Sequence, residues 1–336
     1  MRAFVTGSTG FIGRHLVERL IKLGDEVTCL VRPTADVGSL EAMGVKLRLG
    51  DVTDPHSFAD LCANVDVVYH LAGVIRASDT TEMWRVNEGG VARVIDACAA
   101  ATTPPIFVLM SSLAAAGPSD AEIPLVEDDA PAPISEYGRS KLAGERAARA
   151  RAGRVPVTIV RPPVVFGEYD RETFELFRLA DKGWHVVPGM RQQRLSLVHA
   201  ADLAHLTVEA GERGERVPGP GIEAPAGVGV YYAGDDQRPT FHDLGQLLGE
   251  ALGREVRVVN PPQALSWGLA AVAELAARVR GKPTLLTLDK MREATAGSWM
   301  CSSRKAREQF GLKMRMSLTQ RLTQTAEWYR EAGWLE

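Results

Sequence analysis

The chain has 336 residues, of which 45% are hydrophobic and 24% are charged. This composition provides for a sizeable buried core and excludes an intrinsically disordered chain. The formal net charge is −3, which is too close to neutral to attract nucleic acid, so we expect no nucleic-acid partner.

The N-terminal residues include no charged leader and no long apolar run, so we expect no export signal and a cytoplasmic protein. The longest apolar stretch, 264–279, is interrupted by Glu274. It is shorter than the roughly 20 residues that a membrane span needs, and we expect an amphipathic helix rather than a transmembrane segment. The cysteines have no Cys-x-x-Cys or cysteine–histidine spacing, and we expect reduced thiols that act as small apolar core residues. They are Cys29, Cys62, Cys98 and Cys301.

Short runs rich in Val, Leu and Ile alternate with helical periodicity over about the first 160 residues. This alternation predicts βαβ units and a doubly wound parallel sheet in an α/β fold. Expected strands are 3–6, 26–31, 45–49, 67–70, 107–110 and 157–160, and expected helices are 12–23, 55–62, 83–100 and 135–152.

Beyond Arg161 the chain is rich in proline, and 211–229 is rich in glycine, which indicates loops and excursions. The run 228–233 is predicted to add one more strand to the same sheet. From Thr240 onwards the chain is expected to be mostly helical and to pack with the excursion 163–195 over the sheet.

Three glycines, Gly7, Gly10 and Gly13, follow the first expected strand and open the first expected helix. At this spacing the first glycine permits a tight turn, the second lets the backbone approach a pyrophosphate, and the third allows close packing of helix on strand. The helix N-terminus then faces the anion. A bare glycine triplet is weak evidence, but its position after a strand predicts a phosphate-binding loop.

The segment Val5-Thr6-Gly7-Ser8-Thr9-Gly10-Phe11-Ile12-Gly13 resembles the fingerprint of the extended and atypical short-chain dehydrogenases/reductases, the epimerase/dehydratase superfamily. The resemblance spans nearly the whole chain. It implies a Rossmann fold with a smaller, mostly helical C-terminal substrate domain, and a nicotinamide cofactor. The division that we predict is a dinucleotide-binding domain of 1–162 plus 195–235 and a substrate domain of 163–194 plus 236–336. By analogy with the superfamily, we also expect a homodimer.

The resemblance also implies which residues hold the cofactor. The pair Asp51-Val52 matches the pair that contacts adenine, although Asp51 also suits a turn. The segment 71–73 matches one that passes beneath the cofactor, Asn87 matches an asparagine that braces the site, and 161–167 matches a segment near the nicotinamide. The complete expected set is Gly7, Thr9, Gly10, Phe11, Ile12, Gly13, Arg32, Asp51, Val52, Leu71, Ala72, Gly73, Asn87, Ser111, Tyr137, Lys141, Pro162 and Val164.

The end of the second expected strand indicates which nicotinamide cofactor is used. NAD-selective enzymes place an acid there for the ribose hydroxyls, whereas this chain has Leu30, Val31 and Arg32. A guanidinium at this position would bind a 2′-phosphate through charge-assisted hydrogen bonds, so we favour NADP(H). If Arg32 is only a solvated residue at a strand end, NAD(H) remains usable.

Tyr137 and Lys141 lie four residues apart and therefore on one face of a helix. A free tyrosine has a pKa of about 10, too high for a proton carrier near neutral pH. An ammonium about 4 Å away at an effective dielectric near 20 contributes roughly 4 kcal/mol, or about three pKa units. We therefore predict Tyr137 as the catalytic general acid/base and Lys141 as the residue that lowers its pKa and anchors the ribose. In the resembled family the catalytic Ser/Thr lies five residues before a glycine, and counting back from Gly117 gives Ser112. Ser112 is expected to hold the substrate oxygen, and Ser111 is the fallback, expected to contact the cofactor or the backbone.

Other enzyme classes find little support in the sequence. The chain contains no Gly-x-Ser-x-Gly elbow, which argues against a serine hydrolase. The seven histidines have no metal-ligand spacing, so we expect no metal site.

Two departures from the sugar-nucleotide enzymes of the family bear on the substrate. Those enzymes usually keep an asparagine where this chain has Val164 and an arginine where it has Leu195, although Arg194 lies one place away. The tail, with 264–279, Gly281-Lys282-Pro283 and 303–306, looks like that of the 3β-hydroxysteroid dehydrogenase and dihydroflavonol-reductase-like branch. In that branch the apolar helix covers a hydrophobic substrate or touches a membrane surface; an ordinary core helix is the simpler alternative.

We therefore predict hydride transfer between NADP(H) or NAD(H) and a secondary alcohol or ketone of a bulky, largely apolar substrate, steroid-like, terpenoid or flavonoid-like. The residues predicted to contact that substrate are Ser112, Leu113, Tyr137 and Val165. The first alternative is a nucleotide-sugar epimerase or dehydratase that uses the same Ser-Tyr-Lys triad. The second is a non-catalytic regulator that senses NAD(P).

Overall fold

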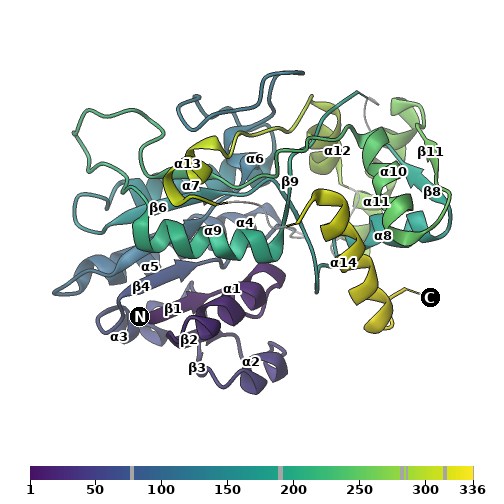
Figure 1. Cartoon of the computed structure of the whole chain (residues 1–336). Coiled ribbons are helices and arrows are strands. Elements are labelled where there is room, and N and C mark those ends of the chain that lie inside the picture. The colour runs from purple at the N-terminus through teal and green to yellow at the C-terminus, as the bar shows by residue number, and fades with distance from the viewer. Residues whose placement is uncertain (76–78, 188–191, 281–283, 285–286, 313–315, 336) are drawn as a thin grey trace.

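A parallel β-sheet forms the centre of the protein (Figure 1). The computed structural model describes residues 1–75, 79–187, 192–280, 284, 287–312 and 316–335. Within this part of the chain, seven strands pair in parallel in the order β10-β6-β5-β4-β1-β2-β3. They are β1 (Arg2–Thr6), β2 (Glu26–Val31), β3 (Lys46–Leu49), β4 (Val67–His70), β5 (Ile106–Met110), β6 (Val157–Arg161) and β10 (Val230–Tyr232). The predicted doubly wound sheet and its added strand at 228–233 are confirmed.

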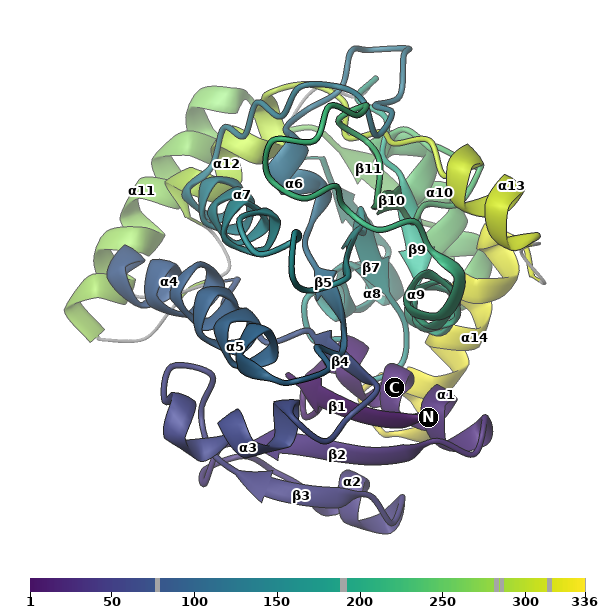
Figure 2. The ribbon, with the colours of Figure 1, turned by 90° about the vertical axis from the view of Figure 1, so that its left-hand side faces the viewer.

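Helices cover both faces of the sheet, as Figure 2 shows. The first and ninth helices pack on one face, where Leu16 and Leu203 join the same apolar cluster as strand residue Val5. The third, fifth and seventh pack on the other face, where Val94 and Ala148 join strand residue Phe107. The helices beside the sheet are α1 (Phe11–Lys22), α2 (Gly38–Ala42), α3 (Ala59–Cys62), α4 (Thr80–Asn87), α5 (Gly89–Ala100), α6 (Leu113–Ala116), α7 (Glu136–Arg149), α9 (Ala200–Arg213) and α13 (Arg304–Phe310).

A second, mostly helical region adjoins the sheet on the right of Figure 1. Its core joins Phe177, Leu248 and Tyr329, so the excursion after β6 packs with the C-terminal helices as predicted. Its elements are α8 (Phe174–Asp181), β8 (Trp184–Val186), α10 (Phe241–Leu252), β11 (Arg257–Val259), α11 (Gln263–Arg280), α12 (Leu288–Thr295) and α14 (Leu318–Glu331). A further parallel pair joins β7 (Val164–Phe166) to β9 (Leu197–His199).

Two of the expected helices are divided in the structure. The predicted helix 83–100 is two helices that meet at Glu88. The Asn87 side chain hydrogen bonds to Val74 and Ser140, and Gly89-Gly90 favour a break in the helix. The predicted helix 55–62 is a 3-10 turn, Pro55–Ser57, followed by α3. The short helices α2 and α6 were not predicted, since one turn gives too little periodicity to recognise.

Helix α11 exposes its apolar side chains rather than burying them. Four of its large side chains are strongly exposed: Leu265 by 54%, Leu269 by 55%, Val272 by 67% and Leu275 by 65%. The alternative of an ordinary core helix is therefore wrong for these four residues. Among the described residues, no helix is both long and apolar enough to cross a membrane. The segment Gly281-Lys282-Pro283 lies outside the described residues. All four cysteines are buried and unpaired, as expected for core thiols.

Candidate active site

The carboxyl ends of the central strands bring the predicted site residues to one edge of the sheet. Thr6 pairs in register with His70, and β4 continues this edge to β5. The strand order reverses between β1 and β4, which is where a doubly wound sheet opens a ligand crevice. His70 Nδ1 lies 3.0 Å from the Thr6 hydroxyl, and burial lowers the pKa of His70 to about 3. The imidazole is therefore a neutral link between these two strand ends.

The glycine loop has the conformation that the fingerprint requires. Gly7 has φ +74°, and a Cβ there would lie 2.6 Å from the Ala72 backbone nitrogen. A Cβ on Gly13 would lie 2.2 Å from the Gly7 carbonyl oxygen. Gly10 is the N-cap residue of α1 and provides no side-chain cap, and the first turn of the helix contains no acid. Its first N–H groups are thus free to receive an anion, and the loop fits a dinucleotide pyrophosphate.

At the end of β3, Asp51 is oriented by its neighbours. The backbone nitrogen and hydroxyl of Thr53 both donate to Asp51 Oδ1, at 2.8 and 2.7 Å. Arg85 on α4 donates to the Thr53 hydroxyl at 2.9 Å. Burial favours the protonated acid, but the Thr53 hydrogen bonds and the charges of Arg85 and Arg32 outweigh it and lower the pKa of Asp51. The turn role and the proposed adenine role of Asp51 are compatible, and Arg32 lies exposed after β2.

Asn87 holds the segment that follows β4 against α7. Its amide oxygen accepts from the Val74 nitrogen at 2.7 Å, and its amide nitrogen donates to the Val74 oxygen and the Ser140 hydroxyl, both at 2.9 Å. A Cβ on Gly73 would lie 3.2 Å from the Asn87 amide oxygen and 3.6 Å from Lys141 Nζ. The backbone at Gly73 therefore passes directly beside the predicted catalytic lysine.

The structure brings Ser112, Tyr137 and Lys141 together. Ser112 is the N-cap of α6, where its Oγ accepts from the Ala114 nitrogen at 3.1 Å, and its hydroxyl lies close enough to the Tyr137 phenol to act on the pKa of that group. Tyr137 lies in the first turn of α7, and Lys141 follows one turn later. Lys141 Nζ donates to the Met110 carbonyl at the end of β5, at 2.7 Å. The cap and the tyrosine contact are thus two functions of the same serine.

Burial shapes the electrostatics of this cluster. Burial lowers the pKa of Lys141 to about 8, against the attraction of Glu145. Burial also raises the pKa of Tyr137, while the neighbouring Ser112 hydroxyl acts in the opposite direction. A lysine that is cationic near neutral pH and a tyrosine beside a serine hydroxyl form an acid–base pair that can move one proton.

A buried ion pair beneath the triad was missed by the sequence reasoning. Arg161 donates to both carboxylate oxygens of Glu145, at 2.8 and 2.7 Å, and both side chains are almost fully buried. The Ser111 hydroxyl donates to Glu145 at 2.5 Å. The structure thus gives the Ser111 hydroxyl a carboxylate partner that was not expected, and its contact with the cofactor stays a prediction. The available signal was an acid one turn after Lys141 and an arginine within a strand.

Helix α12, from the C-terminal part of the chain, contacts the start of α7. Both carboxylate oxygens of Asp289 accept from the Glu136 backbone nitrogen, at 3.1 and 3.0 Å. Lys290 Nζ lies 5.6 Å from the centroid of the Tyr137 ring. About 150 residues separate these groups in the chain, and no motif marks Lys290, so the sequence reasoning could not find it.

The segment after β6 lies beside the triad with mixed exposure. The Pro162 carbonyl accepts from the Leu113 nitrogen at 2.8 Å. The Leu113 side chain is buried in a cluster with Tyr232 and Cys301, so its substrate role stays a prediction that rests on the backbone. Val164 is half-exposed and Val165 is partly buried. Leu195 lies in the core of the helical region, and neighbouring Arg194 donates to the Arg238 carbonyl.

A second polar cluster joins the phosphate-loop helix to the helical region. The carboxylate of Glu168, after β7, lies 3.1 Å from His199 Nε2 and 3.6 Å from His15 Nε2. Gln324 of α14 donates to its other oxygen at 2.6 Å. The next residue, Tyr169, has φ +72°. Within the described residues no group of His, Cys, Asp and Glu is arranged to hold a metal ion.

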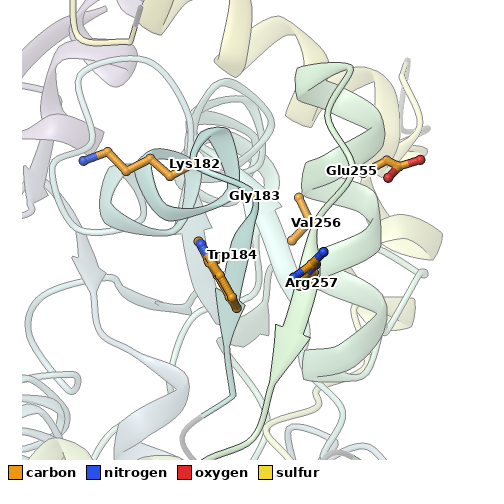
Figure 3. Close-up of a pocket in the computed structure, with 6 residues that line it drawn as sticks. All are labelled: Lys182, Gly183, Trp184, Glu255, Val256 and Arg257. Carbon is orange, nitrogen blue, oxygen red and sulfur yellow. The ribbon is translucent and has the colours of Figure 1, made fainter.

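An open groove lies on the pair β8–β11, as Figure 3 shows. Arg257 lies over the Trp184 ring, with its guanidinium carbon 5.9 Å from the ring centroid. Lys182 and Glu255 also line the groove. None of the predicted site residues belongs to it.

The model of the NAD dependent epimerase/dehydratase family matches residues 3–222. Ceramide reductase of Caulobacter vibrioides is 30% identical over 334 residues, which cover 98% of this chain and 95% of that protein. A decarboxylating sterol-4-alpha-carboxylate 3-dehydrogenase of Dictyostelium discoideum is 25% identical, over 84% of this chain and 87% of that one. The structure of UDP-glucose 4-epimerase from Thermotoga maritima matches with a TM-score of 0.77 at 20% identity, over 99% of both chains. At that identity the structural likeness concerns the fold.

Proposed function

Because the chain belongs to the NAD dependent epimerase/dehydratase family, we propose that it transfers a hydride between a nicotinamide cofactor and a secondary alcohol or ketone of a bulky, largely apolar substrate. The observation that carries this proposal is the convergence of the Ser112 hydroxyl on Tyr137, with Lys141 buried one helical turn away. The family and its reductase and dehydrogenase relatives make the chain an NAD(P)-dependent oxidoreductase.

In the proposed reaction, each residue of the triad has one task. When bound, the nicotinamide supplies the hydride to the carbonyl carbon, or accepts it from the carbinol carbon in the reverse direction. Tyr137 gives its phenolic proton to the carbonyl oxygen as the alcohol forms, and takes that proton back in oxidation. Ser112 holds the reacting oxygen beside Tyr137. Lys141, buried and positively charged below about pH 8, favours the tyrosinate and offers donors to the ribose hydroxyls.

The proposed cofactor is NADP(H), with NAD(H) as the alternative. The glycine loop and the bare N-terminus of α1 accept the pyrophosphate of either dinucleotide. Arg32 lies exposed at the end of β2, where the adenosine ribose is expected, and can pair with a 2′-phosphate. Thr9, Phe11 and Ile12 are proposed to contact the pyrophosphate side, and Asp51 and Val52 the adenine.

An apolar substrate is supported by both the site and the relatives. Val164 and Leu195 stand where polar contacts to a nucleotide sugar are expected, and Leu195 is enclosed in the core. The relatives act, by their names, on ceramide and on a sterol carboxylate. We accordingly propose a lipid-like ketone or alcohol, and we propose that the helical region, 163–194 plus 236–336, is the substrate domain beside a cofactor domain of 1–162 plus 195–235.

We further propose that α11 touches a lipid surface from which such a substrate arrives. Its four large apolar side chains, Leu265, Leu269, Val272 and Leu275, are exposed. Helix α11 packs on α12, and α12 places Lys290 over Tyr137. The apolar face is thus one helix away from the catalytic tyrosine.

The deciding experiment is turnover of defined carbonyl compounds by wild type and Tyr137→Phe. We expect NADPH-dependent reduction of a long-chain 3-keto sphingolipid or a 3-ketosteroid to fall roughly 100- to 10,000-fold in the variant, because the proton donor is lost. Tyr169→Phe is the matched control, since Tyr169 packs on Trp328 outside the triad. Equal turnover by Tyr137→Phe would refute the assignment, and turnover of UDP-glucose in place of the lipids would favour the epimerase alternative. Binding of NADP without any turnover would favour the regulator.

A further inference from the structure

Helix α12 is fixed to the start of the catalytic helix by its first turn. Both carboxylate oxygens of Asp289 accept a hydrogen bond from the Glu136 N–H, at 3.1 and 3.0 Å. Glu136 directly precedes Tyr137. The other end of α12 is held where Trp299 Nε1 donates to the Glu293 carbonyl at 2.8 Å. The residues between these two anchors therefore have a defined position relative to Tyr137.

One of these residues carries a positive charge over the tyrosine ring. Lys290 Nζ lies 5.6 Å from the ring centroid of Tyr137, within the roughly 6 Å over which a cation and an aromatic face attract one another. The ammonium also donates to Glu293 Oε2 at 2.8 Å, which holds it in place. The Lys290 side chain is 35% exposed and that of Glu293 is 15% exposed, so solvent only partly screens this pair.

The charges around Tyr137 come from three elements. Helix α7 contributes Lys141, α12 contributes Lys290 and Glu293, and the loop before α8 contributes Glu172. Both carboxylates raise the pKa of Tyr137, in addition to the larger effect of burial. The other oxygen of Glu293, Oε1, is buried and has no hydrogen-bond partner among the described residues. Two acids thus oppose the tyrosinate, and Lys290 is the cation that α12 supplies against them.

We propose that Lys290 is a positioning residue for proton transfer, whose ammonium over the Tyr137 ring stabilises the tyrosinate against the carboxylates of Glu293 and Glu172. The proposal rests on the proposed function in one respect, since Tyr137 is the proton carrier there. An ammonium near a phenolate attracts it more strongly than it attracts the neutral phenol, so loss of Lys290 leaves the tyrosinate less favoured. Loss of Glu293 has the opposite effect.

The test is a titration of Tyr137 itself. The full chain is labelled with [13Cζ]tyrosine and saturated with NADP+, and the resonance absent from Tyr137→Phe is followed by NMR from pH 6 to 11. We expect Lys290→Met to move the Tyr137 midpoint upward by about one pH unit, a tenfold loss of tyrosinate at a given pH. Lys290→Arg is expected to retain the wild-type midpoint, and Glu293→Gln to lower it.

A double variant separates the electrostatic role from a structural one. In Lys290→Met/Glu293→Gln both charges are gone, and we expect the midpoint to return towards wild type. Arg292→Met is the matched control, because Arg292 is an exposed cation on the same helix that pairs with Asp289; its midpoint is expected to stay unchanged. If Lys290→Met fails to fold, Glu293→Gln and Lys290→Arg still test the proposal.

The proposal is overturned if Lys290→Met and Glu293→Gln both titrate like wild type, or if Tyr137 does not titrate below pH 11 in the wild-type complex. It is also overturned if Arg292→Met moves the midpoint as far as Lys290→Met does. None of these readouts requires turnover. Failure of the proposed function is recognised separately, by equal reduction of the carbonyl compounds in wild type and Tyr137→Phe.

Discussion

At the scale of single residues, the site depends on charges that are buried in pairs. Lys141 and Glu145 stand on successive turns of α7, and Glu145 is fully paired with Arg161. Removing one member of such a pair leaves the other charge buried and uncompensated. This typically lowers the free energy of unfolding by about 3–5 kcal/mol. Glu145 is not available as a proton acceptor, because both of its carboxylate oxygens already accept hydrogen bonds from Arg161 and Ser111. This pairing is consistent with the proposal that Tyr137, and not Glu145, carries the proton.

Arg32 offers a direct test of cofactor choice. We expect Arg32→Ser to weaken NADPH binding by roughly tenfold to a hundredfold, because a charge-assisted hydrogen bond contributes about 1.5–3 kcal/mol. NADH binding is expected to change less than about twofold, since it carries no 2′-phosphate. Both affinities are measured by quenching of protein fluorescence. Arg178→Ser, which alters an exposed pair on α8, is the control, and equal loss of both cofactors in Arg32→Ser would contradict a 2′-phosphate contact.

At the scale of elements, Glu168 ties α1, β9 and α14 together through His15, His199 and Gln324. Burial alone would raise the pKa of Glu168, but the contact with His199 and the charge of His15 lower it to about 2. Burial lowers the pKa of His15. The carboxylate thus joins the phosphate-loop helix to the helical region at neutral pH.

This cluster predicts a specific acid dependence of stability. The folded pKa of Glu168, about 2, lies below the ordinary 4.5, so its contribution is complete above pH 4.5 and is lost as the pH falls towards 2. The contribution is on the order of 3 kcal/mol. We expect Glu168→Gln to lower the free energy of unfolding at pH 7 and to flatten its decline between pH 5 and 3, as measured by urea denaturation. Glu122→Gln, at an exposed position, should keep the wild-type slope, and a wild-type slope in Glu168→Gln would count against the cluster.

At the scale of the whole molecule, the helical region places Lys290 near Tyr137 and, on the neighbouring helix, an exposed apolar face. Helices α11 and α12 pack together, and α12 lies beside α7 (Figure 2). The large apolar side chains of α11 are exposed. Sequence periodicity recognised the helix 263–280 within a few residues. It could not tell which side of that helix meets solvent, because an apolar stripe of this kind fits a core equally well.

Membrane contact through this face is tested with vesicles. We expect wild type to co-sediment with phosphatidylcholine/phosphatidylglycerol vesicles, and Leu265→Glu/Leu269→Glu/Val272→Glu to bind at least roughly tenfold less, since burying one such side chain contributes about 1.5–3 kcal/mol. Ile222→Glu, another strongly exposed apolar position, is the control. No co-sedimentation of wild type would refute the contact. A change from dimer to monomer in the triple variant would instead assign the face to a second copy of the chain.

The sequence by itself determined the sheet, the glycine loop and the candidate triad. Strands buried on both faces are continuous Val, Leu and Ile runs, and the backbone approaches Gly7 and Gly13 too closely for any side chain. Tyr137 and Lys141 are four residues apart, so local geometry alone places them on one face. These features depend on residues that are close together in the chain, so the sequence alone can predict them.

Only the tertiary structure decided which distant residues complete the site. Glu145 and Arg161 meet because α7 packs against β6, and the same packing gives the Ser111 hydroxyl its carboxylate partner. Lys290 reaches Tyr137 because α12 is anchored to the N-terminus of α7. These contacts join segments up to about 150 residues apart, and no spacing rule connects such segments. Their partners are fixed by the packing of the helices and strands, which is decided only when the whole chain has folded.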